Sequence, residues 1–591
     1  MPVQFDNLRR GYVAIAMLLT LAAVLRVLSS YSHTAQAFDE PYHVAAAIEL
    51  LDKGTYTLDP LHPPLERIAI GLPLYLAGER LPNISVSESV ASTTPYLCAV
   101  GNAILNDGGR YARNLMLARL GILPFLLLGC IVVFLWARQE YGDFAGVAAV
   151  GLFTTLPVVL EFSGIAYTDM VAASTQAAAF WAFATWLEKR SMRSTVWLGI
   201  ATGFALLSKF TTLIYLPAAA LSMVALQWSV NRFSKAPRKL AYKQMVKQVL
   251  LAGVIAGALL WAGYGFAVGR VREGLQISTA SMPSFQHFPG PVARIARRLI
   301  LSDPKIPVPA LMRGVAMAWV TEKTEPTGYL LGHIKSGGWW YFFLVGVAVK
   351  TPVPLLILVV AGLFGFKGLA RTGRWSTMAP AACALAILLV TLPVKINYGI
   401  RHVLVIFPLL AIVAGYGCSY LWHLDRGHLN LGHFNGRGRA WGRAALILLL
   451  LWQGVSSVRA SADYTAYFNE IAGKDPSRVL VAGCDLDCGQ DIFALSRELH
   501  QRNVSHATLA LWTSADMSKM DLPKFDVAQP YQPVTGWFAI SLRALREGDL
   551  FHSSYPPDAF AWISRYQPVT HVGKTILLYY IPEDSLGSGS K

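Results

Sequence analysis

The chain has 591 residues, of which 54% are hydrophobic and only 15% are charged. A soluble globular protein has about 25% charged residues, so this composition excludes an ordinary soluble enzyme and indicates a membrane protein. The net charge of +16 does not indicate nucleic-acid binding, because the basic residues stand in short segments between apolar runs, as at residues 232–247 and 426–443. Basic loops of this kind orient membrane spans and contact anionic lipids.

Eleven apolar segments are predicted to cross the bilayer, since a spanning helix needs about 20 mostly apolar residues. The predicted fold is therefore a polytopic α-helical membrane protein with its N-terminus inside and its C-terminus outside. The fifth and sixth segments meet at Ser208 and Lys209, where we expect non-helical backbone beside a cavity. The eleven segments are residues 12–30, 113–136, 143–160, 166–187, 195–208, 211–228, 249–268, 339–366, 377–394, 403–421 and 444–458.

The first segment has a second interpretation as a secretory signal. Arg9 and Arg10 precede the apolar run, and Ala35-Gln36-Ala37 has the small-x-small pattern of a cleavage site. The apolar run is longer than the 7–15 residues usual in signal peptides. An uncleaved membrane anchor is therefore the favoured interpretation.

Three outer segments are long enough to hold catalytic machinery. Residues 31–111 and 269–338 are predicted outer loops of a membrane domain spanning residues 1–458, and residues 459–585 are predicted to form a small C-terminal α/β domain. In this domain we expect a helix at 491–501 and strands at 478–482, 507–512, 536–542 and 575–581. Residues 586–591 are interpreted as a linker or tag remnant. An active site on the outer face has no access to soluble nucleotide sugars, so any transferred group must arrive on a carrier.

Adjacent carboxylates follow the first span. Asp39 and Glu40 precede an amphipathic stretch and then His62-Pro63-Pro64, whose prolines favour a rigid, non-helical turn. A carboxylate held against apolar surface is expected to have a raised pKa and can serve as a general base. The alternative is that both carboxylates are solvated surface groups.

A second acid and a set of cations lie toward the outer ends of later spans. Asp169 begins the fourth span, where an ionisable residue is often functional; a helix N-cap is an alternative role. Lysines inside apolar helices need an anionic partner, and a lipid phosphate would serve. For any single cation, snorkelling to the interface remains the alternative. These basic residues are Lys209, His333, Lys350, Arg401 and His402.

Two further patterns lie in the third outer segment. Cys484 and Cys488 are on the oxidising side, where a local disulfide is permitted. Asp485-Leu-Asp487 matches the D-x-D pattern that holds a metal and a nucleotide sugar in soluble glycosyltransferases. Because no nucleotide pool reaches this side, we interpret the D-x-D match as a loop at a strand end.

Several motifs, in this order, resemble the bacterial protein O-mannosyltransferase-like branch of the GT-C glycosyltransferases, a group that also includes the aminoarabinose transferase of lipid A. The resemblance covers most of residues 1–490. The chain departs from this pattern at Cys488, where many relatives have tryptophan. The motifs are Phe38-Asp39-Glu40-Pro41-Tyr42-His43, His62-Pro63-Pro64-Leu65, Tyr167-Thr168-Asp169, Leu207-Ser208-Lys209-Phe210-Thr211, Gly332-His333 and Asn397-Tyr398-Gly399-Ile400-Arg401-His402.

The resemblance implies an inverting transferase that uses a polyprenyl-phosphate-linked sugar and needs no metal. Asp39 would be the base, with Glu40 beside it, and Asp169 would orient the acceptor or the base. Substrate and lipid phosphate would be bound by His62, Lys209, His333, Arg401 and His402. The partners implied are the sugar lipid, membrane lipids and a protein, lipid or glycan acceptor, at the outer face of a bacterial cytoplasmic (inner) membrane.

Two other functions are compatible with the sequence. A flippase or transporter for lipid-linked sugars predicts charges along a path through both leaflets, whereas here the charges within spans cluster toward the outer half. A non-catalytic scaffold gives no reason for Asp39, Asp169 and Lys209 to gather at one depth.

Overall fold

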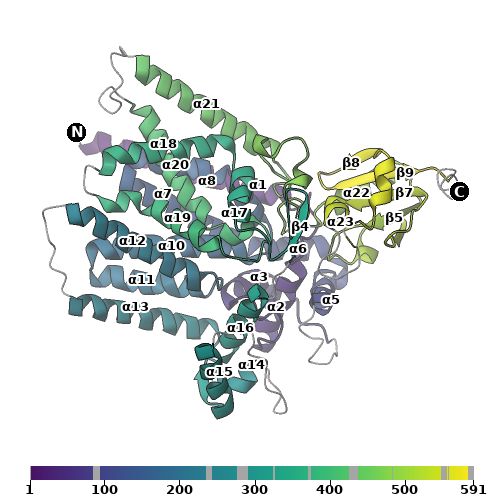
Figure 1. The fold of residues 1–591 in the computed structure, drawn as a ribbon, viewed down its shortest axis with the longest axis horizontal. Coiled ribbons are helices and arrows are strands. Elements are labelled where there is room, and N and C mark those ends of the chain that lie inside the picture. The colour runs from purple at the N-terminus through teal and green to yellow at the C-terminus, as the bar shows by residue number, and fades with distance from the viewer. Residues whose placement is uncertain are drawn as a thin grey trace.

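A body of helices carries a small β-sheet at one end (Figure 1). The structure is a computed structural model that describes residues 2–83, 94–233, 242–275, 290–323, 327–370, 374–424, 437–481, 483–547, 556 and 558–583. The first half of the chain forms α1 (Pro2–Ser30), α2 (Glu40–Lys53), α3 (Pro64–Leu76), α5 (Thr94–Leu105), α6 (Tyr111–Leu120), α7 (Leu123–Tyr141), α8 (Asp143–Thr154), α9 (Pro157–Gly164), α10 (Thr168–Lys189), α11 (Met192–Leu206), α12 (Thr212–Phe233) and α13 (Tyr242–Gly263).

The second half begins with a group of short elements and returns to the helical body. The short elements are β1 (Val268–Arg270), α14 (Val271–Leu275), α15 (Gly290–Ser302), β2 (Lys305–Pro307), α16 (Pro309–Lys323) and the hairpin β3 (Thr327–Leu330) and β4 (His333–Ser336). The helices of the body that follow are α17 (Phe342–Lys350), α18 (Val353–Ala370), α19 (Ala379–Thr391), α20 (Ile406–Trp422) and α21 (Arg437–Arg459).

Five helical segments of the described residues are long and apolar enough to cross a membrane, or up to seven if two bent pairs count as one span each. The predicted count of eleven is therefore not confirmed. Two segments predicted as single spans are broken, α8–α9 by 63° and α17–α18 by 109°. Pro157 and Pro352 stand at these breaks, where proline disfavours a continuous helix.

Helix α20 lies at the centre of the body and packs closely against α8 and α18. The contact depends on small residues, because a Cβ on Gly417 would overlap the carbonyl of Leu358 and one on Gly415 would overlap that of Ala145. Small residues allow helix backbones to approach in this way within apolar surroundings. The 3-10 turn Ile400–Val403, which stands just before α20, carries part of the candidate site.

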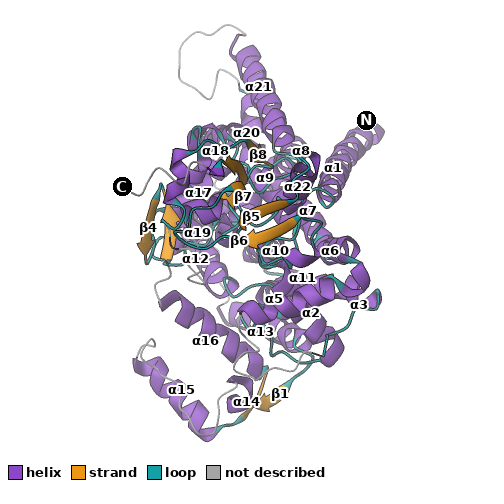
Figure 2. Cartoon of the chain, turned by 90° about the vertical axis from the view of Figure 1, so that its right-hand side faces the viewer, coloured by secondary structure: helices purple, strands orange, loops and turns teal. Residues whose placement is uncertain are grey.

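The C-terminal sheet has the strand order β6-β5-β7-β9-β8, in which β5 runs parallel to β6 and β7 while β9 runs antiparallel to β7 and β8. Figure 2 labels β5, β6, β7 and β8 of this sheet. The expected helix at 491–501 and the strands near 507, 536 and 575 are confirmed. The strand predicted at 478–482 is wrong, since residues 476–478 form a short 3-10 turn and no strand follows through residue 481. The elements are α22 (Ile492–Gln501), β5 (His506–Ala510), β6 (Lys524–Val527), β7 (Gly536–Ser541), α23 (Leu542–Arg546), β8 (Thr570–Val572) and β9 (Ile576–Ile581).

The segment between α21 and the sheet packs with the helices. Tyr464, Leu480 and Cys484 belong to the main helical core, whereas Phe538 and Leu509 belong to separate cores on the two sides of the sheet. The predicted domain boundary at residue 459 stays a prediction. The described residues of this segment, 460–481 and 483–488, therefore belong with the helical body rather than with the sheet.

Candidate active site

Four chain segments that are far apart in the sequence bring the predicted residues together. Asp39 stands immediately before α2, Asp169 lies in the first turn of α10, and Lys209 lies in the break between α11 and α12. Arg401 and His402 lie in a 3-10 turn just before α20. The non-helical break expected at Ser208 and Lys209 is therefore present.

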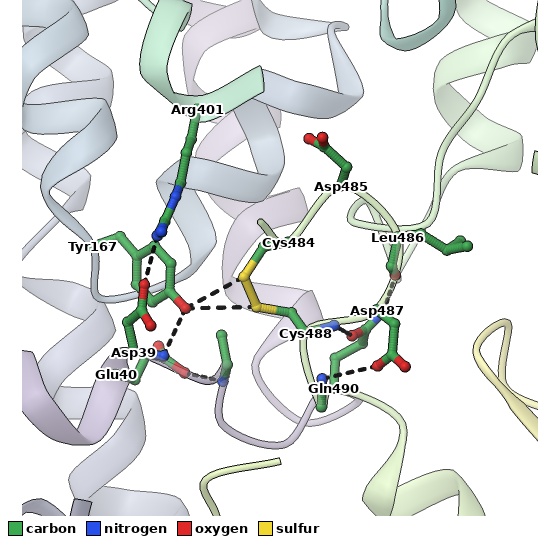
Figure 3. Close-up of a disulfide and its surroundings, with 12 residues drawn as sticks. Asp39, Glu40, Tyr167, Arg401, Cys484, Asp485, Leu486, Asp487, Cys488 and Gln490 are labelled. Carbon is green, nitrogen blue, oxygen red and sulfur yellow. Dashed lines mark hydrogen bonds and ion pairs between the residues drawn. A yellow bond between two sulfur atoms is a disulfide. The ribbon is translucent and has the colours of Figure 1, made fainter. Parts of the chain in front are cut away.

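The Asp39 carboxylate forms an ion pair with Arg401, whose Nη1 lies 2.6 Å from Oδ2. Figure 3 shows the arginine reaching from its turn to this carboxylate. Burial acts to raise the pKa of Asp39, but Arg401, with His43 and His62 nearby, outweighs burial and holds the pKa below its usual value. The expectation of a raised pKa is wrong here, because the structure places a guanidinium where the sequence suggested only apolar surface.

Replacement of Arg401 should move the pH dependence of any reaction that uses ionised Asp39. In Arg401→Gln the burial of Asp39 is no longer opposed by the guanidinium, so its pKa rises and ionisation requires a higher pH. We expect the acidic limb of the kcat/KM profile to move upward by about 1–3 pH units. Arg110→Gln, which alters ion pairs with Asp107 and Glu79 but none with Asp39, is the control and should leave the limb in place. A fixed limb in Arg401→Gln would contradict the assignment of this limb to Asp39.

Asp169 and Lys209 form a second ion pair, with Nζ 2.5 Å from Oδ1. The Asp169 side chain is 2% exposed and that of Lys209 is 12% exposed. The N-cap position of α10 is Tyr167 rather than Asp169, so the alternative role as an N-cap is not seen. The negative charge of Asp169 also raises the pKa of Arg401. The two ion pairs are therefore close enough to interact electrostatically.

His402 is a neutral member of this group. Burial, Lys209 and Arg401 together lower the pKa of His402 well below its usual value. The sequence grouped His402 with the cations, and that interpretation is wrong. Its Nε2 atom is buried and has no hydrogen-bond partner among the described residues, so the imidazole retains a polar atom that a ligand can engage.

Lys350 is not available to a lipid phosphate. Its side chain is fully buried and donates to the carbonyl oxygens of Thr465 at 2.7 Å and Asp485 at 2.5 Å. Lys350 therefore has a structural role, because it links α17 to the segment that follows α21.

Glu40 has a different environment from its neighbour Asp39. Both of its oxygens bind Arg119, each at 2.8 Å, and both side chains are fully buried. The carboxylate also accepts the N–H groups of Ala37 at 2.7 Å and Ala166 at 2.8 Å. This arrangement joins the loop before α2 to α6 and to the loop before α10. Because both oxygens of Glu40 are bound in these contacts, its role in the structure is structural rather than catalytic.

Two histidines lie beside Asp39 and form carboxylate contacts of their own. His62 Nδ1 lies 2.8 Å from Asp59 Oδ2, and His43 Nδ1 lies 3.2 Å from Glu66 Oε1. Burial opposes the charge on His43, but Glu66 raises its pKa to about 9. His43, Asp59 and His62 offer ligand atoms within 4.8 Å of one another and could hold a metal ion. A metal would have to displace the proton of His43 and compete with the contact between Asp59 and His62.

His333 and the D-x-D pair do not join the ion pairs. His333 lies on the exposed strand β4, and the structure records no contact between it and Asp39, Asp169 or Lys209. Asp485 Oδ1 accepts the N–H of Ile400, and Asp487 accepts those of Gly489 and Arg543. Because these carboxylates bind backbone N–H groups, the D-x-D match is structural, although the described residues 476–481 before it form no strand.

Tyr167 is a site residue that sequence reasoning did not identify. Its hydroxyl accepts the N–H of Asp39 at 2.8 Å and lies 3.4 and 3.5 Å from the sulfurs of the disulfide between Cys484 and Cys488 (Figure 3). Its ring also faces the guanidinium of Arg401 at 5.5 Å. Tyrosine is common in apolar segments, so only its place in the motif with Asp169 could have drawn attention to it.

Comparisons with known proteins agree with the resemblance seen in the motifs. A sequence model of the family described as dolichyl-phosphate-mannose-protein mannosyltransferase matches residues 92–261, a stretch that includes Asp169 and Lys209 but not Asp39 or Arg401. This match confirms the resemblance to the protein-mannosyltransferase-like GT-C glycosyltransferases. Among the curated proteins, none matches the chain.

Solved structures with distant likeness include two lipid-carrier complexes. ArnT from Cupriavidus metallidurans bound to undecaprenyl phosphate is 13% identical, with 96% of this chain and 98% of that chain covered and a TM-score of 0.47. The oligosaccharyltransferase AglB from Archaeoglobus fulgidus, in complex with an inhibitory peptide and a dolichol-phosphate, is 12% identical, with 91% and 71% covered and a TM-score of 0.43. At these TM-scores the likeness is too distant to assign a function.

Proposed function

We propose that this protein is a membrane glycosyltransferase that transfers a sugar, with inversion, from a polyprenyl-phosphate-linked donor to a hydroxyl or phosphate of a protein, lipid or glycan acceptor. The observation that carries the proposal is the ion pair of Asp39 with Arg401 in a partly buried site, together with a second ion pair, between Asp169 and Lys209, whose carboxylate also acts on Arg401. The family match over residues 92–261 supports the same class of reaction.

The charges of the site suit a reaction that moves negative charge from a carboxylate to a phosphate. Asp39 and Asp169 balance Arg401 and Lys209, so the site is neutral before a donor binds. In the proposed step, Asp39 takes the proton of the acceptor hydroxyl while the acceptor oxygen bonds to the anomeric carbon. The bond from that carbon to the phosphate oxygen breaks, and its electron pair leaves with the phosphate.

In this step Arg401 can change its partner from the Asp39 carboxylate to the departing phosphate. Before the reaction it neutralises Asp39, and as the carboxylate becomes protonated the guanidinium is released to bind the departing phosphate. Cations aimed at charge that develops in the transition state lower the barrier of the reaction. The neutral imidazole of His402, with its unpartnered Nε2, can donate a further hydrogen bond to a phosphate oxygen. His62 is close enough to influence the charge of Asp39 and can contact the sugar or the acceptor.

The proposed reaction needs no metal, since the cations of the chain can neutralise the leaving group. The membrane setting completes the proposal: the protein would lie in a bacterial cytoplasmic (inner) membrane with Asp39 and the C-terminal sheet on the outer, periplasmic side. An acceptor can then enter from the aqueous side while the prenyl tail stays in the bilayer.

Identification of the lipid that co-purifies with the protein tests this function. Mass spectrometry should find a polyprenyl phosphate or its hexose or pentose conjugate, and incubation with an acceptor should yield a new glycosidic bond of inverted anomeric configuration. A transporter would bind the same lipid without forming a covalent product. Bulk phospholipid alone, with no product from a supplied polyprenyl-phosphate sugar, would contradict the proposal.

Lys209 is proposed to bind the donor phosphate. In Lys209→Met the apolar stem is retained and the ammonium is lost, so we expect the Kd for polyprenyl phosphate to rise about 10–100-fold, the effect of one charge-assisted hydrogen bond. Lys574→Met serves as the control, because that lysine is exposed and binds the carbonyl of Asp463. Equal affinities of the two variants for polyprenyl phosphate in a binding titration would remove Lys209 from the phosphate site.

A further inference from the structure

A disulfide loop lies against the Asp39–Arg401 pair. The sulfurs of Cys484 and Cys488 contact the Tyr167 hydroxyl, which in turn accepts the main-chain N–H of Asp39. The tyrosine is fully buried, and the two cysteines are 3% and 2% exposed. Figure 3 shows the sulfurs, the hydroxyl and the Asp39 backbone in a continuous series of contacts.

The same loop also holds the partner of Asp39. Asp485, the residue after Cys484, accepts the N–H of Ile400 through Oδ1 at 2.9 Å, and Ile400 immediately precedes Arg401. The loop therefore touches both members of the ion pair, Asp39 through the tyrosine and Arg401 through the backbone of its turn. These two members are 362 residues apart in the chain, and a common contact is one means of keeping them in register.

Contacts within the loop restrict its shape. Gln490 accepts the N–H of Cys488 at 2.8 Å and donates to the carbonyl of Leu486 at 2.9 Å. On the opposite side, Gly483 lies so close to the carbonyl of Tyr398 that a Cβ there would overlap it. A close-packed site of this kind cannot absorb a change of loop shape without moving its neighbours.

We propose that the disulfide between Cys484 and Cys488 positions the Asp39–Arg401 pair, with Tyr167 as the positioning residue that transmits its effect. Opening the bond leaves two thiols whose sulfurs must separate to non-bonded contact. Both sulfurs contact the buried tyrosine hydroxyl, so the separation displaces the group that holds the Asp39 backbone. A displacement of about 1 Å in a catalytic constellation can reduce a rate about 100-fold.

The inference rests on the proposed function where it concerns the rate, but its structural part can be tested without any substrate. Peptide mapping of the purified protein should find Cys484 linked to Cys488. Amide hydrogen exchange at Asp39 should be slow in the oxidised protein and faster after reduction with a phosphine, because the N–H loses its hydrogen bond to Tyr167. Free thiols at Cys484 and Cys488 in the protein before reduction, or unchanged exchange at Asp39 after verified reduction of this disulfide, would overturn the inference, whether or not transfer is ever observed.

The rate arm uses transfer from a polyprenyl-phosphate sugar. Reduction should lower kcat at least 10-fold and move the acidic limb of the pH profile upward, as the contact between Asp39 and Arg401 loosens. A role in stability alone would lower the amount of active protein without moving this limb, and that result would overturn the inference. Absence of transfer by the oxidised wild-type protein would count against the proposed function only, since the exchange arm stands by itself.

Variants separate the disulfide from other thiols. The double variant Cys484→Ser with Cys488→Ser, and Tyr167→Phe, should each show a low kcat that reductant no longer changes. Cys383→Ala removes a buried cysteine of α19 and should retain the full response to reductant. A response that persists in Tyr167→Phe would exclude the tyrosine as the route.

Discussion

Asp39→Asn should abolish transfer while the protein still inserts and folds. Asparagine retains the size of the side chain and the main-chain N–H that Tyr167 accepts, but it cannot take a proton from the acceptor. Loss of a general base typically reduces a rate by a factor of about 10²–10⁴. We expect kcat for transfer from a polyprenyl-phosphate sugar to be reduced by at least this factor. Single-turnover transfer with a labelled donor measures the effect directly.

A matched control is Asp107→Asn. Asp107 also pairs with an arginine, Arg110, at 2.6 Å, but its side chain is 59% exposed and lies on the surface before α6. Transfer by this variant should stay within about twofold of the wild-type rate, since surface ion pairs contribute little. Near-normal turnover by Asp39→Asn, with the control also normal, would remove Asp39 from the reaction and leave Asp169 as the acid to examine.

Glu40→Gln should destabilise the protein by about 3–5 kcal/mol, the effect of breaking a buried ion pair by removing one partner. The variant keeps the shape of the side chain but leaves the fully buried Arg119 without its counter-charge. Chemical unfolding in detergent micelles measures the change in the free energy of unfolding. A loss of stability in Glu40→Gln and a loss of activity in Asp39→Asn would assign different roles to the two adjacent carboxylates. Asp39 would take part in the reaction, and Glu40 would hold the loop that contains Asp39.

Glu498→Gln provides the comparison for this second variant. Glu498 pairs with Arg502 at 2.6 Å on the exposed side of α22, and its loss should change the free energy of unfolding by less than about 1 kcal/mol. Equal stabilities of Glu40→Gln and Glu498→Gln would contradict a structural role for the pair.

Much of the candidate site was predictable from local sequence. Asp39, Asp169, Lys209 and Arg401 are ionisable residues next to long apolar segments, where a charge is costly and is retained for a reason. The break at Ser208 and the four C-terminal elements were also predictable, because periodicity and turn residues act within a few positions along the chain.

Most of the failures share one physical origin, which is dependence on distant residues; the two broken spans are the exception, because their prolines are local. The lowered pKa of Asp39 comes from a guanidinium 362 residues away, and the neutrality of His402 comes from burial beside two cations of other segments. The breaks in two predicted spans arise at prolines that hydropathy does not weigh. The segment near residue 478 has the composition of a strand, but its side chains Leu480 and Val481 are buried against helices and against Tyr329.

By itself, the sequence determined the class of the protein and the residue types of its site. Apolar run length predicts a helical membrane body, and isolated charges beside such runs are expected where chemistry or ligand binding offsets the cost of burial. Only the tertiary structure decided which acid meets which cation, which of the adjacent carboxylates is available, and that the Cys484–Cys488 disulfide reaches Asp39 through Tyr167. Charge interactions and protonation depend on distances of a few ångströms between segments that are remote along the chain, and those distances exist only in the folded protein.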